Sequence, residues 1–184
     1  MQSVCVFCGA RPGNDPDILN STLQLADTLV AHNKALVYGG SSTGLMGTLA
    51  DRVLEGGGKV IGIIPNTIVD MEIAHMSLTE QHIVADMASR KNKMMDIADA
   101  CIALPGGFGT LDELFEALTN AQLRLHSKPV GILNVNGYYD SLINFLDHAC
   151  SIGLLAPQNR QLLHIGNTPE ELLNSLGEQR FRPA

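Results

Sequence analysis

The chain has 184 residues, of which 45% are hydrophobic and 17% are charged, and its formal net charge is −7. This is the composition of a globular protein, and it excludes a disordered chain, which would have fewer apolar and more charged residues. The acidic balance argues against nucleic acids and anionic membranes as partners, because their phosphates repel a negative protein. A small anionic ligand needs only a local positive site. The length predicts a single domain over residues 1–184.

Short apolar runs alternate with amphipathic segments along the chain. Apolar residues recur at helical spacing over residues 18–30, 111–125 and 142–150. Because the runs between helices are apolar on both faces, we predict an α/β, Rossmann-like three-layer fold with a mostly parallel central sheet and helices on both faces. The predicted strands are Ser3–Gly9, Ala35–Tyr38, Val60–Ile64, Cys101–Leu104 and Val130–Leu133, with weaker candidates at Gln81–Val84 and Leu162–Ile165.

The four cysteines do not form the pattern of a disulfide scaffold in a chain of this length. Cys5 and Cys8 form a C-x-x-C pair, but they stand in an apolar strand-like run, where cysteine acts as a small hydrophobe. The cysteines and the six histidines show no metal-ligand spacing, so no metal is expected. The start lacks a basic signal region, and no apolar run reaches about 18 residues, so we expect a cytoplasmic protein without a membrane span.

Glycines cluster directly after three of the predicted strands. Gly9 follows the first, Gly39, Gly40 and Gly44 follow the second, and a group beginning at Gly106 follows the Cys101–Leu104 strand. Ligands of open parallel sheets bind at the carboxyl ends of the strands. Three glycine-bearing loops at one edge therefore predict a ligand site there.

The segment 104–113, Leu-Pro-Gly-Gly-Phe-Gly-Thr-Leu-Asp-Glu, joins a strand to a helix. Its glycines let an anion approach the backbone, and the helix start offers free N–H groups, so the segment predicts a phosphate cradle. It lacks the Gly-Lys-Ser/Thr of a P-loop. Glu113 has two interpretations. It completes a T-x-x-E capping box with Thr110, or it turns toward the ligand because a bound phosphate repels it.

A second polar segment, 86–94, opens the helix before the same strand, with Asp86 as its expected N-cap. Arg90, Lys91 and Lys93 concentrate positive charge there in a chain of net −7. Arg90 is suited to a phosphate or ribose oxygen, although a solvated basic face is an equal alternative, and we prefer that alternative for Lys93.

Taken together, these segments resemble the LOG family of cytokinin-activating phosphoribohydrolases, a family often mislabelled as lysine decarboxylase. The resemblance spans almost the whole chain in the same order. It rests on Val6–Gly9, Tyr38–Gly40 with Gly44–Gly47, Gly62–Pro65, Asp86–Met87 with Arg90–Lys91, Pro105–Thr110 with Glu113, Lys128–Gly131 and Gly137–Tyr139. Two positions depart from the family pattern: Ser41 replaces a frequent glycine, and Asp112 replaces a frequent glutamate.

The resemblance implies hydrolysis of the N-glycosidic bond of nucleoside 5′-monophosphates, such as AMP or cytokinin riboside monophosphates, without metal or organic cofactor. It also implies a homodimer, with Arg90 and Glu113 as the catalytic pair. A nucleotide-binding or sensor module of the same fold without catalysis is the alternative. The substrate-binding positions implied are Gly9, Gly40, Glu72, Met87, Lys91, Gly106, Gly107, Phe108, Gly109, Thr110 and Thr119.

Overall fold

The computed structural model describes residues 1–69 and 74–178. Seven strands form one sheet: β1 (Ser3–Phe7), β2 (Ala35–Tyr38), β3 (Val60–Pro65), β4 (Glu80–Val84), β5 (Ala100–Ala103), β6 (Val130–Leu133) and β7 (Leu163–Gly166). The helices are α1 (Pro16–Ala31), α2 (Gly44–Glu55), α3 (Asn66–Val69), α4 (Met87–Ile97), α5 (Phe108–Gln122), α6 (Asp140–Ser151), α7 (Pro157–Arg160) and α8 (Pro169–Glu178), with a 3₁₀ turn, η1 (Val135–Gly137).

The sheet is parallel at every strand pair, in the order β4-β3-β2-β1-β5-β6-β7. From β1 to β4, each strand is added next to the one before it, toward one edge of the sheet. The chain then returns through α4, and β5, β6 and β7 are added on the other side of β1. Cys5 pairs with Val37 on one side and with Cys101 on the other. This reversal creates a crevice at the carboxyl ends of β1 and β5, which is where open α/β sheets bind ligands.

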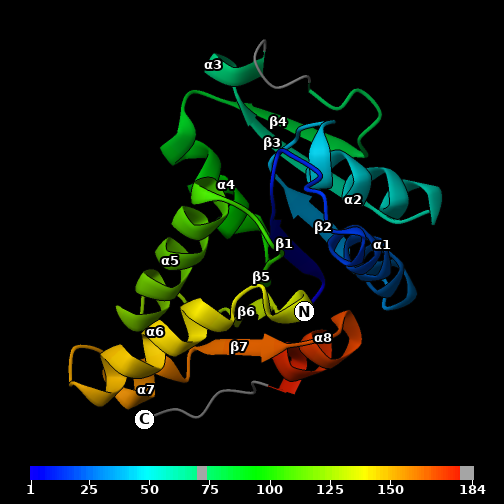
Figure 1. Cartoon of the computed structure of the whole chain (residues 1–184). Helices are drawn as coiled ribbons and strands as arrows, with labels where there is room; N and C mark the ends of the chain where they lie inside the picture. The colour runs from blue at the N-terminus through cyan, green and yellow to red at the C-terminus, as the bar shows by residue number, and fades with distance from the viewer. Residues whose placement is uncertain (70–73, 179–184) are drawn as a thin grey trace.

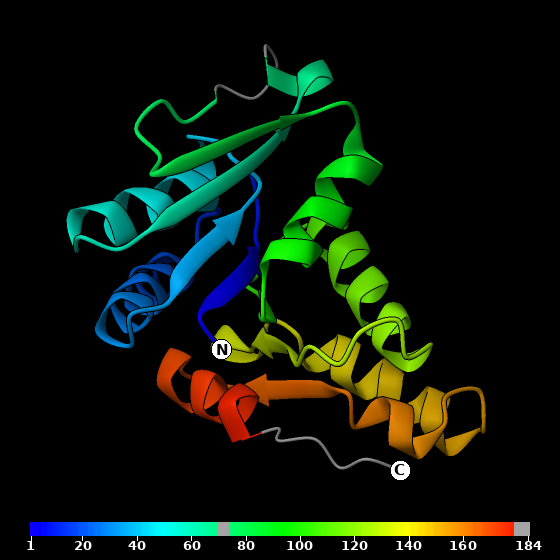
Figure 2. The same cartoon turned by 180° about the vertical axis from the view of Figure 1, so that it is seen from behind.

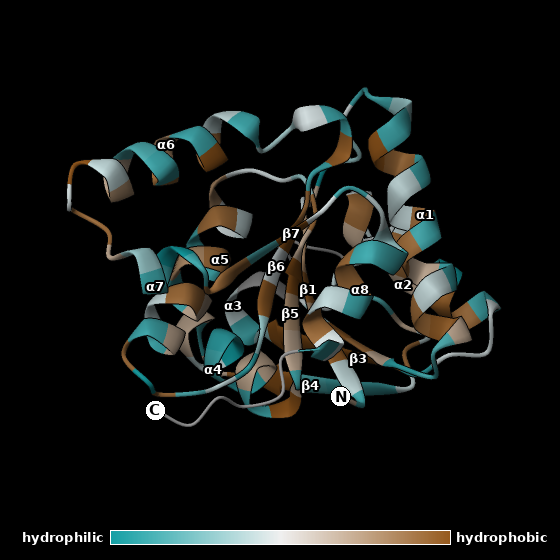
Figure 3. Cartoon of the chain, turned by 90° about the horizontal axis from the view of Figure 1, so that it is seen from below, coloured by the Kyte–Doolittle hydropathy of each residue, from teal (hydrophilic) through white to brown (hydrophobic). Residues whose placement is uncertain are grey.

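Helices cover both faces of the sheet (Figures 1 and 2). Alternate strand residues point to opposite layers: Val4 and Val6 pack with α1, α2 and α8, whereas Cys5 and Phe7 pack with α4, α5 and α6. Figure 3 shows hydrophobic residues concentrated in the central strands, while β4 at the sheet edge is largely hydrophilic. The predicted three-layer fold is confirmed, and its sheet is wholly parallel.

All seven predicted strands are present, and seven of their fourteen ends move by one or two residues. β1, for example, ends at Phe7 rather than Gly9. Cys5 and Cys8 are free, buried and packed into opposite layers, as expected for small hydrophobes. Within residues 1–69 and 74–178, no helix is long and apolar enough to cross a membrane.

Candidate active site

A cavity of about 450 Å³ lies in the crevice between β1 and β5. This volume falls within the usual range for small-molecule sites. Six segments meet there: the loop after β1, α1, the start of α2, the first turn of α4, the start of α5 with the loop before it, and the turn after β6. Its wall consists of Cys8, Gly9, Ala10, Arg11, Pro12, Gly13, Ile18, Leu45, Met46, Met87, Arg90, Pro105, Gly106, Gly107, Gly109, Thr110, Asp112, Glu113 and Tyr138.

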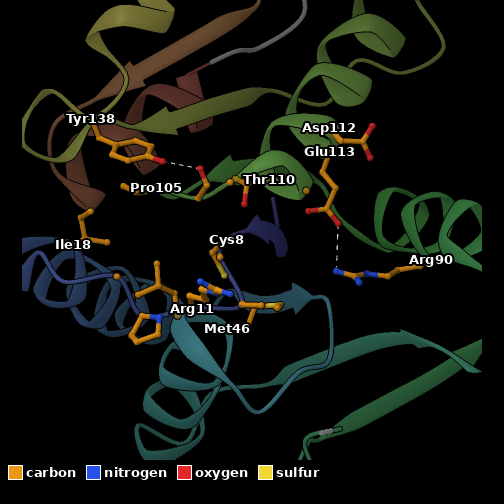
Figure 4. A pocket seen from close by; sticks show the side chains of 18 of the residues that line it. Cys8, Arg11, Ile18, Met46, Arg90, Pro105, Thr110, Asp112, Glu113 and Tyr138 are labelled. Atoms are coloured by element: carbon orange, nitrogen blue, oxygen red, sulfur yellow. Dashed lines mark hydrogen bonds and ion pairs between the residues drawn. The ribbon is translucent and has the colours of Figure 1, made fainter. Parts of the chain in front are cut away.

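A buried ion pair, Arg90 with Glu113, forms part of this wall. Figure 4 shows the two side chains reaching toward each other from α4 and α5. Arg90 Nη2 lies 3.4 Å from Glu113 Oε1, and the two residues are only 6% and 8% exposed. A contact of 3.4 Å is long for a charge-assisted hydrogen bond, which is usually 2.7–2.9 Å. The guanidinium is therefore close to the carboxylate without being fully engaged by it.

The Arg90 guanidinium rests against the end of β2. A Cβ atom on Gly39 would lie 2.2 Å from Arg90 Nη2, so only glycine leaves the side chain its place. Arg90 Nη1 lies 3.8 Å from Met87 Sδ, which is a weak acceptor. The buried Nε of Arg90 has no hydrogen-bond partner among the described residues. A buried donor without a partner is costly. Arg90 therefore keeps one buried donor, Nε, that no described residue satisfies.

The phosphate-cradle prediction concerns the start of α5. The helix begins at Phe108 with Gly107 as its N-cap, and no side chain caps it. Thr110 therefore lies inside the first turn, and Glu113 lies one turn further along. The capping-box interpretation of these two residues is wrong, because the glycine loop lets the helix begin earlier. The uncapped N–H groups and the dipole of this turn are suited to an anion at the cavity wall.

Two tyrosines that follow β6 fix the loop before α5. Tyr138 donates a hydrogen bond of 2.7 Å to the carbonyl oxygen of Gly106, and Tyr139 donates one of 2.7 Å to Leu104. Cys8 lines the same cavity. Burial, and secondarily the Glu113 carboxylate, raises the pKa of the Cys8 thiol well above its ordinary value. Cys8 is accordingly a neutral wall residue and not a nucleophile.

Comparison with known proteins identifies the family of the chain. A family model described as "Possible lysine decarboxylase" matches residues 46–176. A cytokinin riboside 5′-monophosphate phosphoribohydrolase of Arabidopsis thaliana is 46% identical over 95% of this chain and 81% of its own length. A probable enzyme of the same name from Oryza sativa is 47% identical over 95% of this chain and 82% of its own. The chain belongs to the LOG family.

Solved structures with a similar fold are more distant in sequence. The molybdenum cofactor carrier protein of Chlamydomonas reinhardtii matches with a TM-score of 0.72 at 19% identity, over 96% of each chain. The molybdenum cofactor binding protein of Rippkaea orientalis matches with a TM-score of 0.72 at 22% identity, over 96% of this chain and 95% of its own. At these identities the likeness establishes the fold alone, and the LOG-family fold is shared with carrier proteins.

The cavity wall contains eight of the thirteen residues that the sequence predicts for a LOG-family site. Four of the other five lie elsewhere. Gly40 lies beside Ile63 and Ile64, outside the cavity wall. Phe108 is 95% exposed, and Thr119 borders a separate small depression on α5. Lys91 contacts carboxylates on α5, and Glu72 lies outside the described residues. The eight on the wall are Gly9, Met87, Arg90, Gly106, Gly107, Gly109, Thr110 and Glu113.

The loop after β1 supplies side chains to the cavity that the sequence pattern did not indicate. Arg11 lies beside Met46, across the cavity from Thr110 and Glu113 (Figure 4). The sequence feature that could have identified Arg11 as a site residue is its position, two residues after the glycine that follows the first strand. Met46 also lies on the wall, and nothing in its local sequence distinguishes it from a core methionine.

Proposed function

We propose that this protein hydrolyses the N-glycosidic bond of nucleoside 5′-monophosphates, AMP and cytokinin riboside 5′-monophosphates among them, to a free base and ribose 5-phosphate. One observation carries the proposal: the buried Arg90–Glu113 pair lies on the wall of a cavity that also holds the uncapped start of α5. An anion site alone gives no reason for a carboxylate beside it. A carboxylate near an anion site fits a substrate that is negative at one end and becomes positive at another.

The phosphate is proposed to bind at the first turn of α5. Gly107, Gly109 and Thr110 line the cavity there, and the helix dipole favours an anion. From Thr110 to Glu113 the helix rises about 4.5 Å, a distance that a ribose ring can span. A 5′-phosphate on this turn therefore directs the anomeric carbon toward Glu113.

Cleavage develops positive charge on the sugar, as in other glycoside hydrolyses. Glu113 stabilises that charge and accepts a proton from the attacking water. The water oxygen bonds to the anomeric carbon, and the electron pair of the C–N bond leaves with the base, which takes up a proton. Arg90, which lines the cavity, holds a phosphate or ribose oxygen and so sets the position of the sugar.

The other functions considered do not account for these residues. A lysine decarboxylase that uses pyridoxal phosphate needs a lysine for the Schiff base, and no lysine is found among the described residues that line the cavity. A carrier or sensor of nucleotides would use the glycine loops equally well. It gives no role to a buried carboxylate that faces an anion site, and the experiment below separates the two.

Purified protein is incubated with AMP, GMP, CMP and isopentenyladenosine monophosphate, and free base is measured by chromatography. Glu113→Gln is expected to lower base release by roughly 10²–10⁴-fold while nucleotide binding persists. Glu178→Gln, on the exposed end of α8, is the matched control and should behave as wild type. Normal turnover by Glu113→Gln, or equal turnover of AMP and adenosine, would overturn the assignment.

We also propose that the whole chain acts as one nucleotide-binding domain, as a homodimer and in the cytoplasm. The homodimer is supported by apolar side chains that α5 and the following turn leave exposed, Phe108, Leu123 and Leu125 among them. The cytoplasm is supported by four free cysteines. Sedimentation equilibrium of wild type and Leu123→Glu tests the dimer, because a charge in the interface should favour the monomer.

A further inference from the structure

His75 is a buried histidine that the proposed reaction does not use. It lies between α3 and β4, is 7% exposed and is not part of the cavity wall. Its backbone N–H donates a hydrogen bond of 3.0 Å to the carbonyl oxygen of Gly40. Its ring Nε2 lies 2.9 Å from Asp51 Oδ1 on α2, and its ring Nδ1 lies 3.2 Å from the backbone nitrogen of Ser77. One residue thus joins the loop after β2, the helix α2 and the segment that leads into β4.

These hydrogen bonds assign the proton of the His75 ring. A backbone N–H can only donate, so Nδ1 accepts from Ser77 and carries no proton. The proton is then on Nε2, which donates it to the Asp51 carboxylate. Because the neutral ring is held at both nitrogens, segment 74–79 cannot shift relative to α2 without breaking a hydrogen bond.

The loop after β2 needs such a support because it contains two consecutive glycines, Gly39 and Gly40. Gly40 has φ +79°, and glycine has a wider choice of backbone conformations than any other residue. The hydrogen bond from His75 selects one of them. An antiparallel bridge extends this contact between the next residue of the loop and the residue before His75, Ser41 with Ala74. The segment before β4 thus holds the loop in one conformation.

The loop after β2 in turn supports Arg90. A Cβ atom on Gly39 would clash with Arg90 Nη2 and lie 3.1 Å from Met46 Sδ, so both side chains rest against the backbone of Gly39. Met46 belongs to α2, the helix that His75 contacts through Asp51. The loop and the helix that meet beside Arg90 are therefore the two elements that His75 joins.

We propose that His75 is a positioning residue that holds Arg90 in place for the reaction without touching the substrate. If the contacts of His75 are lost, the glycines of the loop regain their other conformations. The guanidinium of Arg90 then loses the surface that fixes its distance to Glu113. This inference rests on the proposed function, in which Arg90 sets the position of the sugar.

Steady-state kinetics with AMP tests this role. His75→Ala removes both ring contacts and is expected to lower kcat/KM by roughly ten- to hundredfold, since a shift of about 1 Å at a reacting centre costs on the order of 10²-fold. His75→Gln, whose amide still donates to Asp51, should keep more of the activity than His75→Ala. His32→Ala is the matched control and should behave as wild type, because His32 meets Glu170 at 3.1 Å on the exposed surface.

A double-mutant cycle with Gly39→Ala shows whether His75 acts through Arg90. Both substitutions displace the same guanidinium, so the double variant should be at most about twofold worse than the more impaired single variant. The NMR signal of the buried Arg90 Nε–H, assigned by its loss in Arg90→Lys, gives a readout without turnover. It should shift in His75→Ala and in Gly39→Ala, and should keep its position in His32→Ala.

Three results would overturn the proposal: multiplied effects in the double variant, an Arg90 signal that His75→Ala leaves unchanged, or a lower melting temperature of His75→Ala with normal kcat/KM. In the last case His75 would serve the fold alone. If His75→Ala does not fold, Asp51→Ala removes the contact of Nε2 and carries the same comparison. Inactive wild type would refute the proposed function, and the Arg90 signal would still test the role of His75.

Discussion

Gly39→Ala should disable the site while leaving the fold largely intact. The added Cβ would lie 2.2 Å from Arg90 Nη2, 2.9 Å from Cζ and 3.1 Å from Met46 Sδ. Non-bonded carbon and nitrogen atoms need about 3.5 Å, so the guanidinium has to move by roughly 1.3 Å away from the end of β2. The clash is with the far end of a long side chain, not with backbone. Arg90 can therefore give way at a modest cost to folding.

The shift falls on the group that is proposed to set the position of the sugar. A misplacement of about 1 Å at a reacting centre costs on the order of 10²-fold in rate, which is about 2.7 kcal/mol in the activation barrier. The free energy of unfolding should fall by only about 1–2 kcal/mol. Activity and stability should thus separate clearly in this variant.

The assay is kcat/KM for AMP from free-base release, with urea denaturation of the same preparation. Gly177→Ala on α8 is the matched control, because a Cβ there meets no atom within 4 Å. If Gly39→Ala keeps kcat/KM within twofold of wild type, then the placement of Arg90 against β2 is not what the reaction depends on. If both glycine variants lose activity equally, the contact at Gly39 is not the cause.

Three further substitutions test the supports of the site. Gly44 has φ +60°, and a Cβ there would lie 2.3 Å from the backbone of Ala10. Gly44→Ala should therefore lower the free energy of unfolding by about 3 kcal/mol. An unchanged midpoint of urea denaturation would contradict this packing. Tyr138→Phe removes the hydrogen bond to Gly106 and should raise the KM for AMP about two- to fivefold with little change in kcat; a change confined to kcat would argue against a role in phosphate binding. Hydrogen bonds from the first turn of α4 lower the pKa of Asp86 below 3.8, so its stabilising effect is present above that value and is lost as the pH falls through the folded-state pKa. Asp86→Asn still caps the helix; melting curves should match wild type near pH 7 and fall less steeply below about pH 4, whereas identical acid limbs would refute the effect.

The fold could be predicted from sequence because its signals are local. A buried parallel strand requires a short apolar run, and a covering helix requires apolar residues at helical spacing. Both patterns are complete here, so all seven strands were found. The ends of the helices and strands were harder to predict than the elements themselves. The apolar spacing continues to Leu125, but α5 ends at Gln122, and Arg124 adopts φ +59°, which a helix cannot continue through.

The site was predictable only in part, because its side chains meet through tertiary packing. Glycines after strands located the correct sheet edge, and the strand order then placed two of their loops together. Spacing along the chain could not show which carboxylate each cation meets. Arg90 and Lys91 are neighbours in sequence, yet one pairs with Glu113 in the cavity and the other with Asp112 outside it. The roles of the two cations, Arg90 in the catalytic pair and Lys91 in substrate binding, came from the family resemblance and not from the charge pattern.

The net charge of −7 and the proposed affinity for a phosphate are compatible because they act at different distances. Charges scattered over the surface are screened beyond roughly 8–10 Å, whereas the start of α5 presents its dipole to a ligand in direct contact. The formal charges of the cavity wall cancel, so no strong positive field extends from the site to attract polyanions. The proposed selectivity for a single small phosphate is therefore attributed to a helix start in a cavity of about 450 Å³, with nearby carboxylates that would repel additional phosphate groups.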